Sequence, residues 1–231
     1  WADYKVADIY APTAQKIFWN HLYQGLYTKG VDSWWLDATE PAYKDGLYPE
    51  KQTQWSKKAG KTFIGSAARY LNTYSYVLTK MMYENLREQS DNRASVLTRS
   101  AFAGQQRFGT SIWSGDIYAS WDVLKKQLVA GLNICMTGIP YWTTDIGGFR
   151  VRSRENSGEG TGEISTEIHR NISSCDGGYA KGLKDSAYLE LYTRWFQYGA
   201  LSPIFRAHGT EVPREIWHFG EPGYFMTFKL R

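Results

Sequence analysis

Short apolar runs alternate with amphipathic stretches along this chain, and three of the runs end in aspartate. The runs that close on Asp37, Asp116 and Asp145 begin near 31, 111 and 139, and two further strand-like runs lie at 94–98 and 202–206. Apolar residues recur at helical spacing in the intervening stretches, at 13–28, 66–88, 120–133 and 185–199. Ser120 is the predicted N-cap of the third helix. Strands that alternate with helices in this way predict a parallel α/β protein.

The placement of the aspartates favours one parallel architecture over another. In a (β/α)8 TIM barrel the catalytic groups lie at the C-terminal ends of the strands, and a doubly wound sheet also binds ligands at strand ends. A doubly wound sheet normally has a Gly-rich phosphate loop directly after a strand, however. The nearest candidate here, GEGTG at 158–162, lies inside a polar surface loop predicted at 147–182. About five strands are recognisable, fewer than a full barrel contains, so we predict that 1–231 is the later part of a barrel.

Charge and cysteine content argue against several functional classes. The net charge is +4 and the basic residues are scattered, so no nucleic-acid partner is predicted. No apolar run approaches the roughly 18 residues of a membrane-spanning helix, so membrane insertion is not expected. The two cysteines, Cys135 and Cys175, indicate neither a disulfide framework nor a cellular compartment, and Cys135 is expected to be a small buried hydrophobe. No His, Cys, Asp or Glu cluster has metal-ligand spacing, so no metal or other cofactor is predicted.

The aromatic content is the unusual compositional feature. Aromatic residues make up 16% of the chain, with ten Trp and seventeen Tyr, and many stand beside Gly, Asp or Thr at the ends of apolar runs. Trp and Tyr combine a flat apolar face with a polar tip. Sugars present flat C–H faces edged with hydroxyls, so this mixture suits a carbohydrate site. A large aromatic core would give the same composition.

Two of the strand-end aspartates could perform glycoside hydrolysis with retention of configuration. That reaction needs one carboxylate that attacks the anomeric carbon and a second carboxyl group that protonates the leaving oxygen and then activates water. Asp37 and Asp116 each follow a strand-like run and each lie near a tryptophan. Position alone leaves simpler interpretations open, because Asp37 could begin a helix that has Pro41 in its first turn, and Ser114-Gly115-Asp116 could be a turn.

Four motifs in order resemble the catalytic barrel of glycoside hydrolase family 31. They are GVDSWWLDATEP, RSAFAGQQRFGTSIWSGD, GIPYWTTDIGGF and RWFQYGALSPIFRAHG, and together they span nearly the whole chain. That family contains α-glucosidases, α-xylosidases and related transglycosylases. The resemblance implies a single partial catalytic domain over 1–231, containing about strands four to eight. The early strands and the flanking β-domains would then belong to other parts of the same protein.

The resemblance also implies roles for individual residues. Asp37 corresponds to the nucleophile, Asp116 to the general acid/base, and Glu40 to a residue that supports the nucleophile. Arg99 corresponds to an arginine near the nucleophile and the nonreducing sugar, where its charge would favour ionised Asp37. The resemblance implies that the remaining site residues hydrogen-bond sugar hydroxyls (Asp145, His208) or line the sugar pocket (Trp35, Trp113, Phe149). Arg206 and Trp217 are interpreted as scaffold.

This sequence departs from the family pattern in two places. Thr39 replaces a common Asn between Asp37 and Glu40, and the stretch from Arg99 to Asp116 is one residue longer than in many relatives. The second departure leaves the loop's details open, including any role for Arg107.

The predicted activity is therefore a retaining, exo-acting α-glycoside hydrolase that releases a nonreducing-end α-xylose or α-glucose from an oligosaccharide or polysaccharide-derived substrate. Its two carboxyl groups should lie roughly 5–5.5 Å apart. The alternatives are an α-transglycosylase that uses the same site and a non-catalytic carbohydrate-binding domain, which would be expected to lack one carboxylate. An α-galactosidase of a related barrel family would not contain the WWLD and IWSGD contexts together. Glucose and xylose differ by one hydroxymethyl group, and two motifs, PYWTTDIGGF and SPIFRAHGTEVPREIW, lean weakly towards α-xylosidases.

Overall fold

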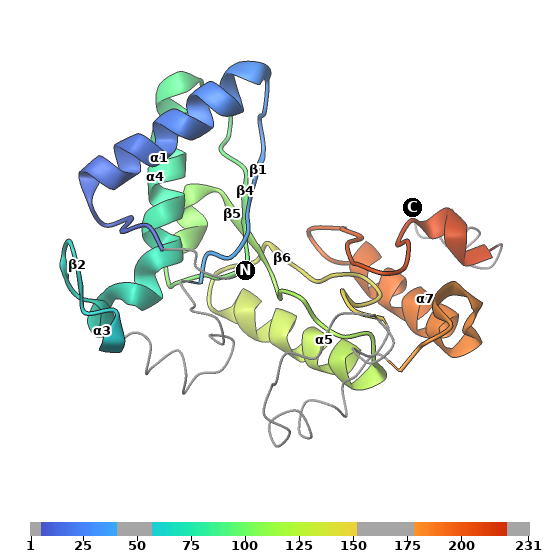
Figure 1. The fold of residues 1–231 in the computed structure, drawn as a ribbon. Helices are drawn as coiled ribbons and strands as arrows, with labels where there is room; N and C mark the ends of the chain where they lie inside the picture. Colours follow the sequence, from blue (N-terminus) through green and yellow to red (C-terminus); the bar gives the residue numbers. More distant parts are fainter. Residues whose placement is uncertain (1–5, 41–56, 152–177, 221–231) are drawn as a thin grey trace. The chain divides into compact units, whose positions relative to one another are not determined.

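A computed structural model describes residues 6–40, 57–151 and 178–220 (Figure 1). The sequence predictions at Pro41, at 158–162 and at Cys175 lie outside these residues, as does most of the predicted 147–182 loop. The chain divides into two compact units, Trp1–Ile112 and Trp113–Arg231. Among the described residues, no helix is both long and apolar enough to cross a membrane.

The first unit is organised around parallel strands. Strands β1 (Trp34–Leu36), β4 (Val96–Thr98) and β5 (Thr110–Trp113) pair in the order β1-β4-β5. Both pairings are parallel, with Trp34 opposite Val96 in one and Val96 opposite Thr110 in the other. The parallel α/β prediction is confirmed for these strands, which are shorter than the apolar runs suggested.

Helices α1 (Pro12–Gly25) and α4 (Tyr74–Gln89) pack against each other in the first unit (Figure 1). Pro12 begins α1, where its missing N–H costs no helical hydrogen bond. A short 3₁₀ helix, η1 (Tyr27–Lys29), follows and ends at Gly30 in a left-handed conformation. The core that these elements share with the strands combines side chains from both helices, from β1 and β4, and from the N-terminal segment: Ile9, Trp19, Trp34, Leu78, Met81, Met82, Leu86 and Val96.

The single helix predicted at 66–88 is wrong, because the segment is divided into three pieces. A hairpin of β2 (Lys61–Thr62) and β3 (Gly65–Ser66) leads into α3 (Ala67–Tyr70), a 3₁₀ turn η2 (Leu71–Thr73) and then α4. The break lies at the carbonyl of Tyr70. It accepts hydrogen bonds from the Tyr10 hydroxyl at 2.6 Å and from Thr73 Oγ1 at 2.8 Å. Side chains thus take the place of the backbone donor that a continuous helix would supply.

In the described residues of the second unit there are two long helices. Helix α5 (Trp121–Met136) is capped by Ser120, whose Oγ accepts from the Val123 N–H at 3.1 Å, as predicted. Helix α7 (Ser186–Ala200) is capped by Asp185, which accepts from the Ala187 N–H. The shorter elements of the unit are β6 (Trp142–Thr143), η6 (Gly182–Lys184) and η7 (Ile216–Phe219). One more 3₁₀ helix, η3 (Gln105–Phe108), lies in the first unit.

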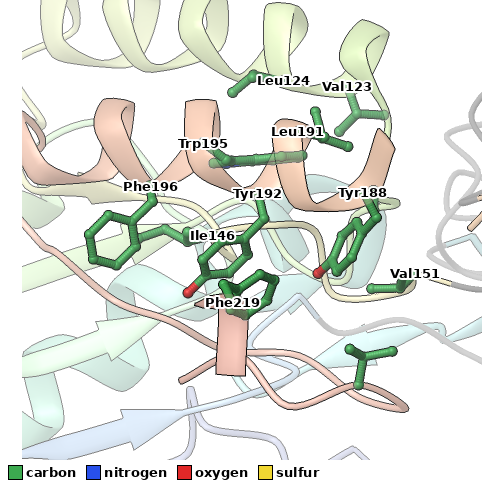
Figure 2. Packing of buried hydrophobic residues seen from close by; sticks show 12 residues of the cluster. Val123, Leu124, Ile146, Val151, Tyr188, Leu191, Tyr192, Trp195, Phe196 and Phe219 are labelled. Carbon is green, nitrogen blue, oxygen red and sulfur yellow. The ribbon is translucent and has the colours of Figure 1, made fainter. Parts of the chain in front are cut away.

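Helix α7 supplies five of the twelve buried residues that form the core of the second unit, more than any other described element (Figure 2). Leu191 and Trp195 point towards Val123 and Leu124 of α5, while Tyr192 stacks on Phe219 with ring centroids 3.4 Å apart. Full burial of a large apolar side chain contributes about 1.5–3 kcal/mol, so the buried face of α7 makes a large contribution to the unit's stability. The abundance of aromatic residues therefore reflects, in part, a large aromatic core.

Two sequence predictions in this unit are wrong. No strand forms at 202–206, because the Leu201 and Ser202 N–H groups bond back to the end of α7 and Pro203 has no N–H to donate to a ladder. Cys135 is exposed and not buried. It lies on α5 beside a row of exposed apolar residues that includes Leu132 and Met136. The helix was therefore predicted correctly, but the apolar face that contains Cys135 is exposed and not buried.

Candidate functional site

Asp37 and Arg99 lie next to each other because of the strand register. The last pair of the β1–β4 ladder is Leu36 opposite Thr98, and each of the two residues follows its strand directly. Parallel strands end at the same edge of the sheet, so the two side chains leave it from adjacent positions. This places a carboxylate and a guanidinium at the C-terminal edge of the sheet, where barrel enzymes carry their chemistry.

The Arg99 guanidinium bridges two carboxylates. Its Nη1 lies 3.2 Å from Asp37 Oδ1, while Nη2 and Nε lie 2.6 Å and 2.8 Å from Glu40 Oε1. Arg99 and Glu40 are 20% and 25% exposed, whereas Asp37 is 56% exposed. The forked donor geometry suits arginine and would be lost with lysine. Arg99 therefore holds Asp37 in place while the carboxylate remains accessible.

The backbone after Asp37 adopts an unusual conformation. Ala38 has a φ of 51°, in the left-handed region that residues with a Cβ rarely adopt. The Ala38 N–H donates to Asp37 Oδ1 at 2.7 Å. Both contacts of Asp37 thus fall on Oδ1, and within the described part of the chain Oδ2 accepts no hydrogen bond. A locally strained backbone at a strand end is typical of functional sites.

A buried polar network fixes the backbone beside Arg99. Thr39 Oγ1 lies 3.0 Å from Ser100 Oγ and accepts from the Ser100 N–H at 3.2 Å. The Ser100 carbonyl accepts from Ser75 Oγ at 2.6 Å and from Gln105 Nε2 at 3.4 Å. Thr39, which replaces the family's common Asn, therefore links the segment after β1 to the segment after β4. Sequence reasoning missed Ser75 and Gln105, since no local pattern marks a polar residue on η3 or α4 as buried.

Trp34 and Trp35 point to opposite sides of β1. Trp34 is buried in the core, and Trp35 is 48% exposed. This alternation follows from the two-residue period of a strand. Trp35 therefore presents an accessible aromatic surface from the strand that carries Asp37.

Asp116 lies in the second unit, after β5. Gly115 precedes it with a φ of 80°, and Asp116 itself is exposed. The next residue, Ile117, accepts hydrogen bonds through its carbonyl from the N–H groups of Phe149 at 2.7 Å and Arg150 at 3.1 Å. The segment that carries Asp116 is thereby tied to the loop that follows β6.

Asp145 forms a buried ion pair with Arg206, whose Nη1 donates to Asp145 Oδ1. Burial raises the pKa of Asp145 to about 7, against the opposing attraction of Arg206, and the negative charge of Asp116 raises it further. Asp145 Oδ2 accepts no hydrogen bond from the described residues. The interpretation of Arg206 as scaffold did not include this contact with a predicted site residue. Its position two residues before His208 in the RAHG segment was the signal available in the sequence.

The aromatic residues predicted in this unit differ in their surroundings. The rings of Phe149 and His208 lie 5.5 Å apart at their centroids, each partly exposed. Trp113 is buried, and the Arg206 guanidinium lies 5.4 Å from its ring centre. Trp217 is largely exposed and contacts only its neighbour His218 among the described aromatic residues.

The predicted site residues thus form two groups, one in each unit. The first contains Asp37, Glu40 and Arg99, with Trp35 nearby. The second contains Asp116, Asp145, Phe149 and His208, to which the structure adds Arg206. The separation of the Asp37 and Asp116 carboxyl groups stays a prediction. In the described parts of the chain, no three His, Cys, Asp or Glu side chains cluster in a way that could hold a metal ion.

Comparison with known proteins identifies the family. The family model described as "Glycosyl hydrolases family 31 TIM-barrel domain" matches residues 1–229. The chain belongs to this family. Its resemblance to family 31, inferred from four motifs, is confirmed, and so is the parallel α/β barrel class.

Individual relatives of this family 31 domain include enzymes named for xylose. The α-xylosidase of Saccharolobus solfataricus is 38% identical over 208 residues, which is 89% of this chain and 23% of that protein. The crystal structure of a family 31 α-xylosidase from Xanthomonas citri matches with a TM-score of 0.78 and 35% identity, covering 97% of this chain and 22% of that one. An α-xylosidase from a soil metagenome, complexed with xylose, matches with a TM-score of 0.74 and 29% identity over 96% of this chain and 30% of that one. The chain therefore spans about a quarter of the length of these relatives.

Proposed function

We propose that the protein to which this domain belongs is a retaining α-glycoside hydrolase that releases a terminal α-linked sugar through a covalent glycosyl-enzyme. The observation that carries the proposal is the Arg99 bridge, which holds Asp37 beside Glu40 at a strand end while Asp37 stays exposed. The family membership supports a glycosidase, and the geometry supports the choice of nucleophile.

Asp37 has the arrangement that a nucleophilic carboxylate needs. Its Oδ1 is held by Arg99 and by the Ala38 N–H, which restricts rotation of the carboxylate. In the proposed mechanism Oδ2 attacks the anomeric carbon and forms the glycosyl ester. Glu40 balances the charge of Arg99, so the guanidinium orients the nucleophile without neutralising it completely. Pre-orientation of a reacting group is a principal source of catalytic rate.

Asp116 is proposed as the general acid/base. It would donate a proton to the departing glycosidic oxygen and later remove a proton from the attacking water. Its exposed position after a glycine with positive φ suits a group that must exchange protons with solvent between the two steps. The proposal requires that its carboxyl group lie roughly 5–5.5 Å from that of Asp37 in the complete enzyme.

The remaining residues of the second group are proposed to bind the terminal sugar. A buried carboxylate oxygen without a donor is energetically unfavourable, and a sugar hydroxyl would supply the hydrogen bond that Asp145 Oδ2 does not receive from the described residues. His208 and Phe149 are proposed to contribute a second hydroxyl contact and an apolar wall. Trp35 and Trp113 are proposed as further parts of the wall. Such a site, mostly apolar with a few directed polar groups, is typical of small-molecule recognition.

α-Xylose is the substrate we favour at the nonreducing end. The support is the printed names of the relatives, since the Saccharolobus solfataricus protein and both solved structures are α-xylosidases. The second candidate, α-glucose, is favoured by a 31% identical relative from Pseudescherichia vulneris that is named as a family 31 glucosidase. Transglycosylation uses the same intermediate, and product analysis at high substrate concentration separates it from hydrolysis.

We also propose that residues 1–231 form the later part of the barrel, about strands four to eight, and that other segments of the same protein complete it. The support is the small number of parallel strands among the described residues, together with the exposed apolar face of α5. Expressed alone, 1–231 should be poorly soluble or inactive. A well-behaved monomer with full glycosidase activity would contradict this part of the proposal.

The mechanism is tested by trapping the covalent intermediate in the complete enzyme. 5-Fluoro-α-D-xylopyranosyl fluoride, or its glucose analogue, should react once and then turn over slowly, because the ring fluorine disfavours the oxocarbenium-like transition state while fluoride leaves readily. Mass spectrometry should find one glycosyl group on the peptide that contains Asp37 and none in Asp37→Ala. Proton NMR of a normal substrate should show the α-anomer as first product. Labelling at another residue, or a β-anomer formed first, would overturn the mechanism.

A further inference from the structure

Arg214 is a buried arginine for which the proposed mechanism has no role. It is 5% exposed, and its guanidinium donates almost entirely to main-chain carbonyls. Nε and Nη2 reach the Gly148 carbonyl at 3.1 Å and 2.9 Å. Nη2 also donates to the carbonyls of Phe149 at 3.0 Å and Thr210 at 3.2 Å, and Nη1 donates to that of Val212. Burial of a charged side chain is energetically unfavourable unless the charge is hydrogen-bonded. The burial of Arg214 among carbonyl groups therefore indicates that the structure at this position requires its guanidinium.

These carbonyls belong to two loops that carry proposed sugar-binding residues. The first loop, 144–151, follows β6 and contains Asp145 and Phe149, and the second loop, 207–213, contains His208. The Thr210 N–H also donates to the Phe149 carbonyl at 3.0 Å, and Arg150 pairs with Glu211 at 3.7 Å. Arg214 therefore lies at the junction where the two loops meet.

The backbone around Arg214 is packed too closely to accept side chains. A Cβ added at Gly209 would lie 2.6 Å from both Nε and Nη2 of Arg214. A Cβ at Gly148 would lie 2.5 Å from the Ala119 nitrogen, and Gly148 has a φ of 79°. Both glycines thus let the loops approach the guanidinium and the segment after Asp116. The packing leaves little freedom for the guanidinium to take another position.

We propose that Arg214 is a positioning residue that holds Phe149 and His208 in the geometry required to bind the terminal sugar. This inference rests on the proposed function. The planar fork of arginine directs several donors to carbonyls on different loops at once, whereas lysine presents a single ammonium on a flexible chain. Removal of the fork should let the two loops separate, so that the sugar-binding residues lose their mutual orientation.

The test uses the complete enzyme with 4-nitrophenyl α-D-xylopyranoside as substrate and free xylose as competitive inhibitor, or the glucose pair if that is the sugar turned over. Arg214→Lys should raise the inhibition constant of the free sugar about tenfold and lower kcat/KM roughly a hundredfold, the scale expected for displacement by about 1 Å. Gly209→Ala places a Cβ against the Arg214 guanidinium from the 207–213 loop. It should also raise the inhibition constant and lower kcat/KM. Arg194→Lys is the matched control, because Arg194 is an exposed arginine on α7 that pairs with Glu190.

The outcomes separate positioning from stability and from failure of the proposed function. A change in stability alone lowers the melting temperature and the active fraction, but leaves the inhibition constant of the folded enzyme unchanged. Folded variants that keep wild-type inhibition constants would therefore overturn the inference, as would loss of folding in both Arg214→Lys and Gly209→Ala. A wild-type enzyme that turns over neither glycoside would instead contradict the proposed function itself.

Discussion

Replacement of Arg99 by lysine should lower kcat/KM, because lysine cannot keep the contacts of Arg99 with both Asp37 and Glu40. Arginine reaches Asp37 through Nη1 and Glu40 through Nε and Nη2, while a lysine ammonium can keep only one of these partners. Glu40 is the less exposed partner and has the shorter contacts, so we expect lysine to stay with Glu40 and to release Asp37.

The energy at stake is that of one charge-assisted hydrogen bond to the proposed nucleophile. Such a bond contributes about 1.5–3 kcal/mol when it is protected from solvent. Because Asp37 is 56% exposed, solvent screening reduces the value towards the lower end of that range. We therefore expect a loss of about 2 kcal/mol, equivalent to roughly a thirtyfold decrease in kcat/KM. Arg99→Met also leaves Glu40 without its partner, and should cost about 4 kcal/mol, or roughly a thousandfold.

The assay measures kcat/KM of the complete enzyme on one aryl glycoside and one alkyl glycoside, with melting temperature as a check on folding. The decrease should be similar for both substrates, because the nucleophile is required whatever group departs. Arg87→Lys is the matched control and should stay within about twofold of wild type, since Arg87 also contacts two acceptors, the carbonyls of Asp91 and Asn92, through Nη1, but lies at the exposed end of α4. The reasoning is refuted if folded Arg99→Lys keeps kcat/KM within about threefold of wild type, or if Arg99→Met is no worse than Arg99→Lys.

Three further predictions concern other parts of the domain. Asp116→Ala should lose most activity on unactivated glycosides but keep fast glycosylation with an aryl glycoside, and azide attack on the β-linked covalent intermediate should then release an α-glycosyl azide; exclusive formation of the β-azide would contradict the assigned roles. Asp145 has a pKa of about 7 in the folded protein against an ordinary value of 3.8, so the folded state binds more protons between these values, and the free energy of unfolding should decrease as pH rises from about 4 to about 7. Asp145→Asn should flatten that pH dependence in denaturant titrations, and an unchanged slope would show that another group is responsible. Leu191→Ala should destabilise the second unit by about 2–5 kcal/mol, because the side chain is fully buried against α5, whereas Leu201→Ala, at a largely exposed position, should change the melting temperature little.

Sequence patterns predicted those features of the domain that depend on local spacing. Helical periodicity located α1, α5 and α7 closely, because an amphipathic helix has the same 3.6-residue repeat wherever it packs. Strand positions were also largely recovered, since a buried strand followed by a polar residue is marked by composition alone. The four ordered motifs then identified the family and the candidate carboxylates Asp37 and Asp116. Local patterns gave wrong predictions at 66–88 and at 202–206. In the first segment the Tyr10 hydroxyl bonds to a carbonyl that a continuous helix would use. In the second, backbone N–H groups bond to the end of α7 and not to a neighbouring strand.

The contacts between distant residues were decided only by the tertiary structure. Arg99 meets Asp37 because β1 and β4 pair in parallel with Leu36 opposite Thr98, and no pattern within either segment specifies that register. The Asp145–Arg206 pair and the contacts of Arg214 with the Gly148 and Phe149 carbonyls likewise join positions that are about sixty residues apart. A side chain's role in such a contact depends on which backbone or charge the fold brings to it. Strand register, loop packing and burial determine that partner. None of these can be deduced from the spacing of residues within one segment.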